Sequence, residues 1–154
     1  MIVGIDPGAK GALAFFDPVA GTLDIVDMPT VQVMRNAKSK VEISPQMLAA
    51  VIGARHPSVA VLEKVGAMPS QGLSSTWQFA RGVGMIEGVL SALHIPIVYI
   101  TPQGWQKAVG MRGGKDGGRA RAAEIFPAYA ATFARVKDDG RADAALMAWW
   151  GVMR

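Results

Sequence analysis

The first eleven residues constrain the fold more than any other stretch. They read MIVGIDPGAKG, an almost wholly apolar run that ends in one carboxylate, Asp6, followed at once by Pro7 and Gly8. Such a run, with β-branched residues, predicts a buried strand rather than an amphipathic helix, and Pro-Gly ends it. An acid at the end of a buried strand loses solvation energy unless a cation or hydrogen-bond donors meet it. The stretch therefore favours a ligand site at Asp6; the alternative is an aspartate that only caps the turn.

A later strand repeats this arrangement. Residues 58–63 read SVAVLE, again a buried-type strand that ends in a carboxylate, Glu63. Ser44 and Pro45 provide an N-cap and a first-turn proline for a helix that leads up to this strand. If the helix joins two parallel neighbours, Asp6 and Glu63 emerge at the same edge of the sheet, where open α/β sheets bind ligands.

The remaining pattern completes an α/β prediction. Two apolar segments follow the first strand closely and predict a three-strand antiparallel meander, and a further apolar run predicts another strand. Helical spacing predicts one long helix, and Thr101-Pro102 opens a short one. We expect a single domain over residues 1–154, with a mixed five-stranded sheet flanked by helices. The segments are strands at 12–16, 22–26 and 95–100 and a helix at 74–93.

Composition narrows the class of protein. The chain has 154 residues, 51% apolar and 18% charged, which suits one globular domain. It has no cysteine, which excludes a disulfide framework, a thiolate nucleophile and Cys-ligated zinc. No signal peptide and no long apolar span are evident, so we expect a cytoplasmic protein without membrane contact. His56 and His94 fall at predicted helix ends, where histidines are usually solvated, so we do not expect histidine-based catalysis.

The excess of positive charge is concentrated in two segments. Net charge is +4, which suits a polyanionic partner without requiring one. Residues 28–40 show no clean period and carry Arg35, Lys38 and Lys40, which predicts a basic surface loop that either touches a phosphate backbone or is merely solvated.

The second basic segment is rich in glycine. Residues 111–121 read MRGGKDGGRAR and resemble a mobile phosphate-contacting loop, although not a Walker loop, because Lys115 is followed by Asp116. The candidate DNA-binding residues in and before this segment are Lys107, Arg112, Lys115, Arg119 and Arg121.

Glycines inside the long helix predict close packing. Gly82, Gly84 and Gly88 thin one side of it, and each costs up to about 1 kcal/mol in a helix interior. Close approach of another backbone would offset that cost, either in a second subunit or within the monomer. The candidate dimer-interface residues are Trp77, Gly84 and Gly88.

Further acids precede the last apolar helix. Asp138, Asp139 and Asp143 lie near its start, where acids are common for dipole reasons. At 100° per residue, Asp139 and Asp143 share a face and Asp138 does not, so Asp138 would face solvent or pair with a base such as Lys137 or Arg141. Together with Asp6 and Glu63, these acids either bind one or two Mg²⁺ ions or are unrelated caps and surface groups. Acids at two strand ends of a basic protein favour the metal site.

The order of these motifs resembles the RuvC family of Holliday-junction resolvases over nearly the whole chain. The motifs are GIDPG at 4–8, VLE at 61–63, QFARG at 78–82 and ADAA at 142–145. The resemblance implies a ribonuclease-H-like fold and a homodimer that nicks strands of like polarity across a four-way DNA junction. It implies Mg²⁺ as cofactor, with Mn²⁺ as a substitute, and no nucleotide cofactor. By position, the catalytic, metal-binding acids would be Asp6, Glu63, Asp143 and a fourth, Asp139 on the helical-face argument, with Lys107 and Lys115 near the scissile phosphate.

The sequence departs from the family pattern at two positions. Gly66 stands where bacterial members carry an aromatic residue, and Gly140 stands where the fourth acid often lies, three before Asp143. The small size and the changed position 66 favour a phage-type member, in the host cytoplasm if phage-encoded, by resemblance alone. A flap or branched-DNA nuclease of the same fold and a non-catalytic junction-binding module are alternatives. An actin-like ATPase would need a second such domain, for which 154 residues leave no room.

Overall fold

The computed structural model describes residues 1–35, 37–66 and 72–154. Its main sheet follows the order β3-β2-β1-β6-β7. The first three strands are antiparallel neighbours, whereas β6 is parallel to β1 and β7 is parallel to β6. The predicted meander and the mixed five-stranded sheet are therefore confirmed. The strand bounds are β1 Ile2–Ile5, β2 Ala12–Asp17, β3 Thr22–Asp27, β6 Val59–Glu63 and β7 Ile97–Ile100.

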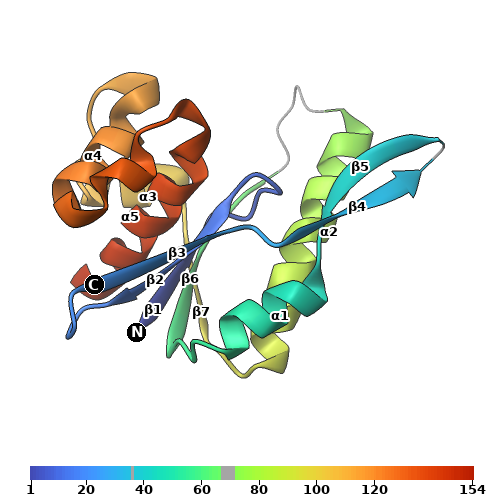
Figure 1. The fold of residues 1–154 in the computed structure, drawn as a ribbon, viewed down its shortest axis with the longest axis horizontal. Coiled ribbons are helices and arrows are strands. Elements are labelled where there is room, and N and C mark those ends of the chain that lie inside the picture. The colour runs from blue at the N-terminus through green and yellow to red at the C-terminus, as the bar shows by residue number, and fades with distance from the viewer. Residues whose placement is uncertain (36, 67–71) are drawn as a thin grey trace.

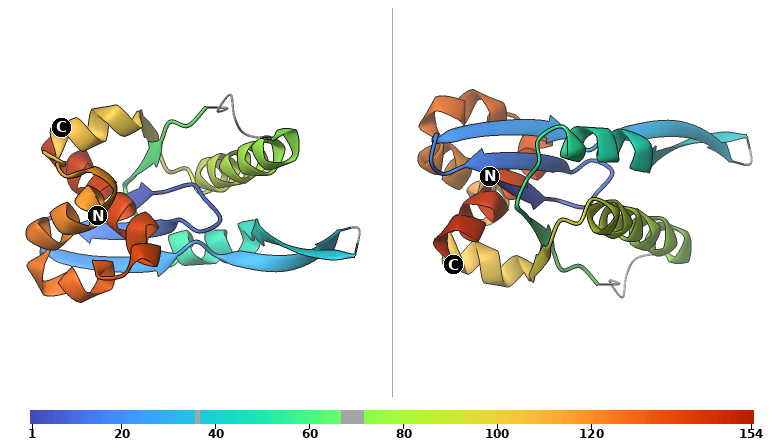
Figure 2. Two further views of the ribbon diagram at one scale, coloured as in Figure 1. Left: turned by 90° about the horizontal axis from the view of Figure 1, so that it is seen from above. Right: turned by 90° about the horizontal axis from the view of Figure 1, so that it is seen from below.

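Helices cover both faces of the sheet (Figures 1 and 2). One layer holds α5 (Asp139–Met153) with α3 (Pro102–Ala108) and α4 (Gly117–Ile125), and the other holds α1 (Pro45–Gly53) and α2 (Leu73–Ala92). Along β2, alternate side chains enter different cores, because successive strand residues point to opposite faces. The core on the α5 side contains Ala12, Ala14 and Phe16, and the core on the α1–α2 side contains Leu13 and Phe15.

Short 3-10 turns lie at Gly114–Asp116, Pro127–Phe133 and Val136–Asp138.

Local capping agrees with the sequence. The Ser44 hydroxyl accepts from the Met47 amide at the start of α1, and the Thr101 hydroxyl accepts from the Gly104 amide at the start of α3. Both α1 and α3 have proline in the first turn, where a backbone N–H would have no partner within the helix, so its absence loses no hydrogen bond. None of the helices in the described residues is long and apolar enough to cross a bilayer.

Glycine at position 4 lets α5 lie directly on β1. A Cβ atom on Gly4 would stand 2.1 Å from the Ala144 carbonyl oxygen and 2.5 Å from the Ala148 nitrogen, both backbone atoms that cannot yield. A Cβ on Gly140, at the start of α5, would stand 2.8 Å from Asp6 Oδ2. The helix therefore runs back along β1, with its N-terminal end over the residue where that strand ends.

The loop predicted for residues 28–40 is wrong. Residues Thr30–Arg35 form β4 and Lys38–Ile43 form β5, an antiparallel hairpin separate from the main sheet. The β-branched residues at 31, 33, 41 and 43 do alternate with polar residues, which is the strand period. The cations between them obscured that pattern.

The mobile loop predicted for residues 111–121 is also wrong from residue 117 onward, where α4 begins. Its glycines allow close packing instead of motion. A Cβ on Gly117 would stand 2.2 Å from the Arg112 carbonyl oxygen, and one on Gly118 would stand 2.9 Å from Asp143 Oδ1. Residues 66–72, whose sequence between two glycines predicts a loop, fall largely outside the described residues.

Candidate active site

Asp6 and Glu63 lie side by side at the carboxyl edge of the sheet. The strands β1 and β6 are parallel neighbours, as predicted, and their register pairs Ile5 with Leu62. In both strands the residue after this pair is the acid, so Asp6 and Glu63 lie next to each other at the same end of the sheet. The Gly8 amide donates to Asp6 Oδ1 at 3.3 Å, which ties Asp6 to its own turn.

Glu63 is held by a residue that the sequence analysis did not single out. The indole Nε1–H of Trp105, in α3, donates to Glu63 Oε1 at 2.8 Å. Trp105 is completely buried, and a buried indole N–H needs an acceptor. The signal was available in the sequence, since a tryptophan one turn into a capped helix must find such a partner.

The start of α5 supplies two further acids. Asp139 and Asp143 are one helical turn apart, as the 100° rule predicted, and both line a hollow between α5 and the glycine-rich segment. Gln106, Met111, Gly114 and Gly118 complete its lining.

Position 140 has no room for a side chain. A Cβ there would meet Asp6 Oδ2 at 2.8 Å and the Lys10 carbonyl oxygen at 3.0 Å, so any side chain would collide with the site. The acids flanking this position are therefore the available ones.

Asp138 is not directed into the hollow. It is 1% exposed and bonded to Arg135 at 2.9 Å, with Arg141 at 3.4 Å. The Arg135 guanidinium is the main cause that lowers the pKa of Asp138 to about 2. The predicted pairing with Arg141 is confirmed and the solvent-facing alternative is excluded. Arg135, the closer partner, was missed.

Burial and neighbouring carboxylates raise the pKa of Asp6 and of Asp143. Burial raises the pKa of Asp6 to about 6, the charge of Glu63 adds to this rise, and the Gly8 amide opposes it. Burial raises the pKa of Asp143 to about 7, with the charges of Asp6, Glu63 and Asp139 adding. Negative charges from three separate chain segments therefore act on Asp143, and a bound cation would relieve this repulsion.

The donor set fits a hard divalent cation. Carboxylate oxygens are the ligands that Mg²⁺ prefers, and burial together with neighbouring carboxylates disfavours the charged forms of Asp6 and Asp143. In the part of the chain that the structure describes, no group of three or more acids stands close enough to enclose an ion as it is. The chemistry of the side chains thus suits the metal, although the ligand cage is not closed.

Four of the five basic candidates divide into two kinds. Lys107 and Arg112 are exposed, whereas Arg119 and Arg121 are engaged within the protein. Arg119 donates to Asp139 Oδ1 at 2.7 Å, to Asp116 and to the Ala134 carbonyl oxygen at 3.4 Å. Arg121 donates to the Val109 carbonyl oxygen at 2.6 Å and to Glu124 at 2.8 Å. The backbone of Lys115 lies in the 3-10 turn before α4.

The candidate interface residues lie on the outer side of α2. Trp77 is 68% exposed, and a Cβ on Gly84 or Gly88 would meet no described atom within 4 Å. Gly82 does not share that side, as the sequence analysis had assumed, because its Cβ would stand 3.2 Å from Ile43 Cδ1 on the inner side. Only the outer glycines can admit another backbone. A shallow apolar groove lies beside them, lined by Val65, Phe79, Ala80 and Val83 among others.

The raised pKa values make a stability prediction for the metal-free protein. A carboxyl group whose pKa is higher in the folded state destabilises the fold as pH rises from about 4 to about 7. Asp143→Asn removes one carboxylate and with it part of this destabilisation, so at pH 8 the variant should melt several degrees above wild type. Each kcal/mol gained in the free energy of unfolding raises the melting temperature by about 2–4 °C. The two should converge near pH 4. Differential scanning fluorimetry in EDTA measures both.

Magnesium provides the matching control. Added Mg²⁺ should raise the wild-type melting temperature at pH 8 and leave the Asp6→Asn/Asp143→Asn double variant unchanged, because a ligand stabilises only the fold that binds it. Equal shifts in both proteins would contradict a metal site at this edge.

The sheet order, with helices on both faces, is that of a ribonuclease-H-like fold. No protein-family model and no curated protein matches the chain. Among solved structures it is similar to Thermus thermophilus RuvC, with a TM-score of 0.60, 13% identity, and coverage of 99% of this chain and 95% of that one. It is also similar to T. thermophilus RuvC in complex with Holliday junction substrate, with a TM-score of 0.62, 14% identity, and coverage of 99% and 94%. Yeast mitochondrial Holliday junction resolvase Ydc2 has a TM-score of 0.47, with 17% identity and coverage of 96% and 75%. The two RuvC matches establish the fold.

Proposed function

We propose that this chain is a Mg²⁺-dependent endonuclease that resolves four-way DNA junctions by paired nicks in strands of like polarity. The observation that carries the proposal is the placement of Asp6, Glu63, Asp139 and Asp143, from three chain segments, at one edge of the sheet. The fold supports the choice of substrate, because the similar RuvC has been solved with a Holliday junction substrate.

The four carboxylates would hold the metal. Bound Mg²⁺ would supply Lewis-acid stabilisation of charge at the scissile phosphate and a more acidic water. The chain's own residues prepare the site: Trp105 fixes one oxygen of Glu63, and the Gly8 amide fixes one of Asp6. Arg119 holds Asp139 from outside the hollow. Lys107 and Arg112 are exposed nearby and would bind phosphates.

A junction-cleavage assay tests the proposal. A four-way junction labelled on each strand in turn is incubated with the protein in Mg²⁺, in Mn²⁺ and in EDTA, beside a linear duplex of the same sequence. We expect symmetric nicks in two strands of like polarity with either metal, and intact DNA in EDTA. Cleavage of flaps and forks in preference to the junction would indicate a branched-DNA nuclease. Tight junction binding with no cleavage in either metal would indicate a non-catalytic binding module.

Paired nicks need two active sites, so we propose a homodimer through the outer side of α2. Two sites on one twofold axis require an isologous interface, and the outer glycines would let two helices approach closely. The exposed Trp77 would cover part of that interface.

Gly84→Arg should therefore convert the dimer to a monomer. The position is exposed and its Cβ meets nothing, so the monomer fold should be unaffected. Light scattering at micromolar concentration should show roughly half the wild-type mass. Ala50→Arg adds the same charge to an exposed position of α1 and should leave the dimer intact. A monomeric wild-type protein would count against this interface.

A further inference from the structure

The β4–β5 hairpin forms a two-stranded sheet of its own and extends away from the main sheet beyond α2 (Figure 2). Its outer part buries little: Met34 is 69% exposed, Val41 45% and Val31 41%. An isolated two-stranded hairpin is only marginally stable in water, so contacts at its base must hold it in place.

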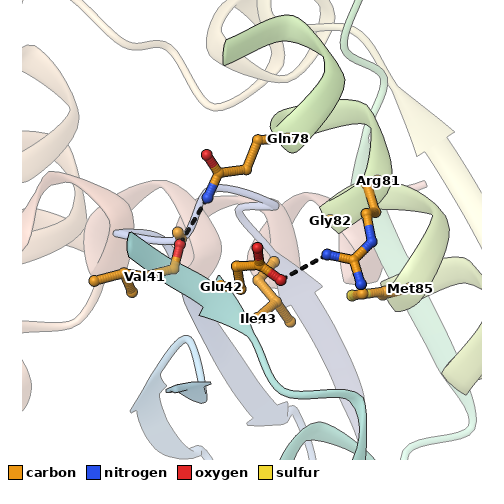
Figure 3. Close-up of a pocket in the computed structure, with 8 residues that line it drawn as sticks. Val41, Glu42, Ile43, Gln78, Arg81, Gly82 and Met85 are labelled. Atoms are coloured by element: carbon orange, nitrogen blue, oxygen red, sulfur yellow. Dashed lines mark hydrogen bonds and ion pairs between the residues drawn. The ribbon is translucent and has the colours of Figure 1, made fainter. Parts of the chain in front are cut away.

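The base of the hairpin is fastened to α2 (Figure 3). The Gln78 side chain donates to the Val41 carbonyl oxygen at 2.9 Å, and Arg81 pairs with Glu42 at 2.6 Å. Ile43 is buried where Gly82 makes room for it. These contacts fix the direction in which the hairpin projects.

The same contact region adjoins the candidate active site. Ala9, in the loop that follows Asp6, lines one hollow together with Val41, Glu42 and Ile43. The Met28 amide, just before the hairpin, donates to the Gly11 carbonyl oxygen in the same loop at 2.9 Å. The base of the hairpin is therefore in contact with the loop that follows Asp6.

The register places the hairpin's cations together. Val33 pairs with Lys40, and Arg35 pairs with Lys38, so these four positions share one face of the hairpin by strand alternation. Residues 30–41 contain these three cations and no acid; Glu42 shares the face at the base of the hairpin, where it pairs with Arg81. A strand face of this kind complements a polyanion. A second copy of this chain fits it poorly, because that copy would bring a net charge of +4 and the same cations.

We propose that the β4–β5 hairpin is a DNA-binding arm, which contacts the phosphate backbone of a duplex segment adjoining the scissile strand through Arg35, Lys38 and Lys40. This role rests on the proposed function for its substrate, and it adds a contact surface away from the acids and from the α3–α4 side. The sequence left this segment open between a DNA contact and a solvated loop, and the register favours the contact.

The test removes the three charges and measures binding. The variant Arg35→Gln/Lys38→Gln/Lys40→Gln is titrated against a labelled four-way junction in EDTA over a series of KCl concentrations. Each lost phosphate contact lowers the log–log salt slope by about 0.9, so the slope should fall by about 2–3. Affinity near 0.1 M salt should fall at least tenfold. Nicking at saturating protein should stay close to wild type, because the acids are untouched.

A control variant removes three cations elsewhere. Arg55→Gln/Lys137→Gln/Arg154→Gln changes net charge equally, just after α1, before α5 and at the C-terminus, and should keep the wild-type slope. Thermal melts of both variants establish that each is folded. If the hairpin variant does not fold, Lys40→Glu alone replaces it and should lower the slope by at least about one contact.

Several outcomes would contradict the proposal that the hairpin binds DNA. These are an unchanged slope, an equal loss in the control variant, or a loss of dimer mass in light scattering that accounts for the weaker binding. A wild-type protein that binds no DNA would overturn it together with the proposed function. A wild-type protein that binds but never cuts, with the slope reduced in the hairpin variant, would support the arm and reject only the nuclease.

Discussion

Asp6→Asn and Glu63→Gln should each reduce the rate of junction cleavage by about 10³-fold or more while junction affinity stays the same or rises. Each change keeps the size of the side chain and removes its charge, which a metal ligand needs. The amide introduced by Glu63→Gln retains an oxygen that can accept from Trp105, so the local structure should persist. Affinity depends mainly on Lys and Arg contacts to phosphates, and losing a negative charge at the edge can only favour the DNA.

Single-turnover cleavage and gel-shift titration measure the two quantities separately. Asp24→Asn is the matched control, because Asp24 is an exposed acid of β3 paired with Arg55, and it should cut at the wild-type rate. Substantial cleavage by both active-site variants would refute the proposed centre.

Asp139→Asn should lose cleavage activity but keep its stability, whereas Asp138→Asn should lose stability but keep its activity. Asp139 shares the hollow with Asp143, so Asp139→Asn should slow cleavage by about tenfold or more and change stability little. Arg119 keeps Asp116 and the Ala134 carbonyl oxygen as partners when Asp139 loses its charge.

Asp138→Asn should leave the cleavage rate of the folded protein nearly unchanged and lower its stability. Asp138 is buried and bonded to Arg135, and a hydrogen bond between charged groups contributes about 2 kcal/mol. A drop in melting temperature of about 4–8 °C would follow at neutral pH. This loss should shrink as pH falls towards 2, where Asp138 becomes protonated in the folded state too. If Asp138→Asn instead abolishes cleavage without loss of stability, the fourth acid has been assigned to the wrong residue.

Several features could be predicted from local patterns. Apolar runs that end in an acid identified β1 and β6, and proline after an N-cap identified α1 and α3. The helical angle between Asp139 and Asp143 needs only a common helix, and the structure provides one. Each of these predictions depends on residues close together in the chain.

The two loop predictions were wrong because basic residues and glycines occur in mobile loops and also in well-packed strands and helices. The cations of β4 and β5 resembled those of a solvated loop, because strand pairing is decided by a partner strand and by the α2 surface. The glycines at the start of α4 suggested mobility, but they make room for the Arg112 backbone and the Asp143 carboxylate. The sequence also could not show that Arg119, predicted to bind phosphate, pairs with the carboxylates of Asp116 and Asp139.

The sequence by itself determined which residues carry charge at the ends of strands and helices, since the two- and 3.6-residue periods are local properties of the chain. Only the tertiary structure decided which of these charges meet. Gly4 brings α5 onto β1, Gly140 leaves room for Asp6 below the start of α5, and Trp105 reaches Glu63 from another layer. Such contacts depend on packing between segments more than 40 residues apart, and backbone sterics and burial select them after the local elements have formed.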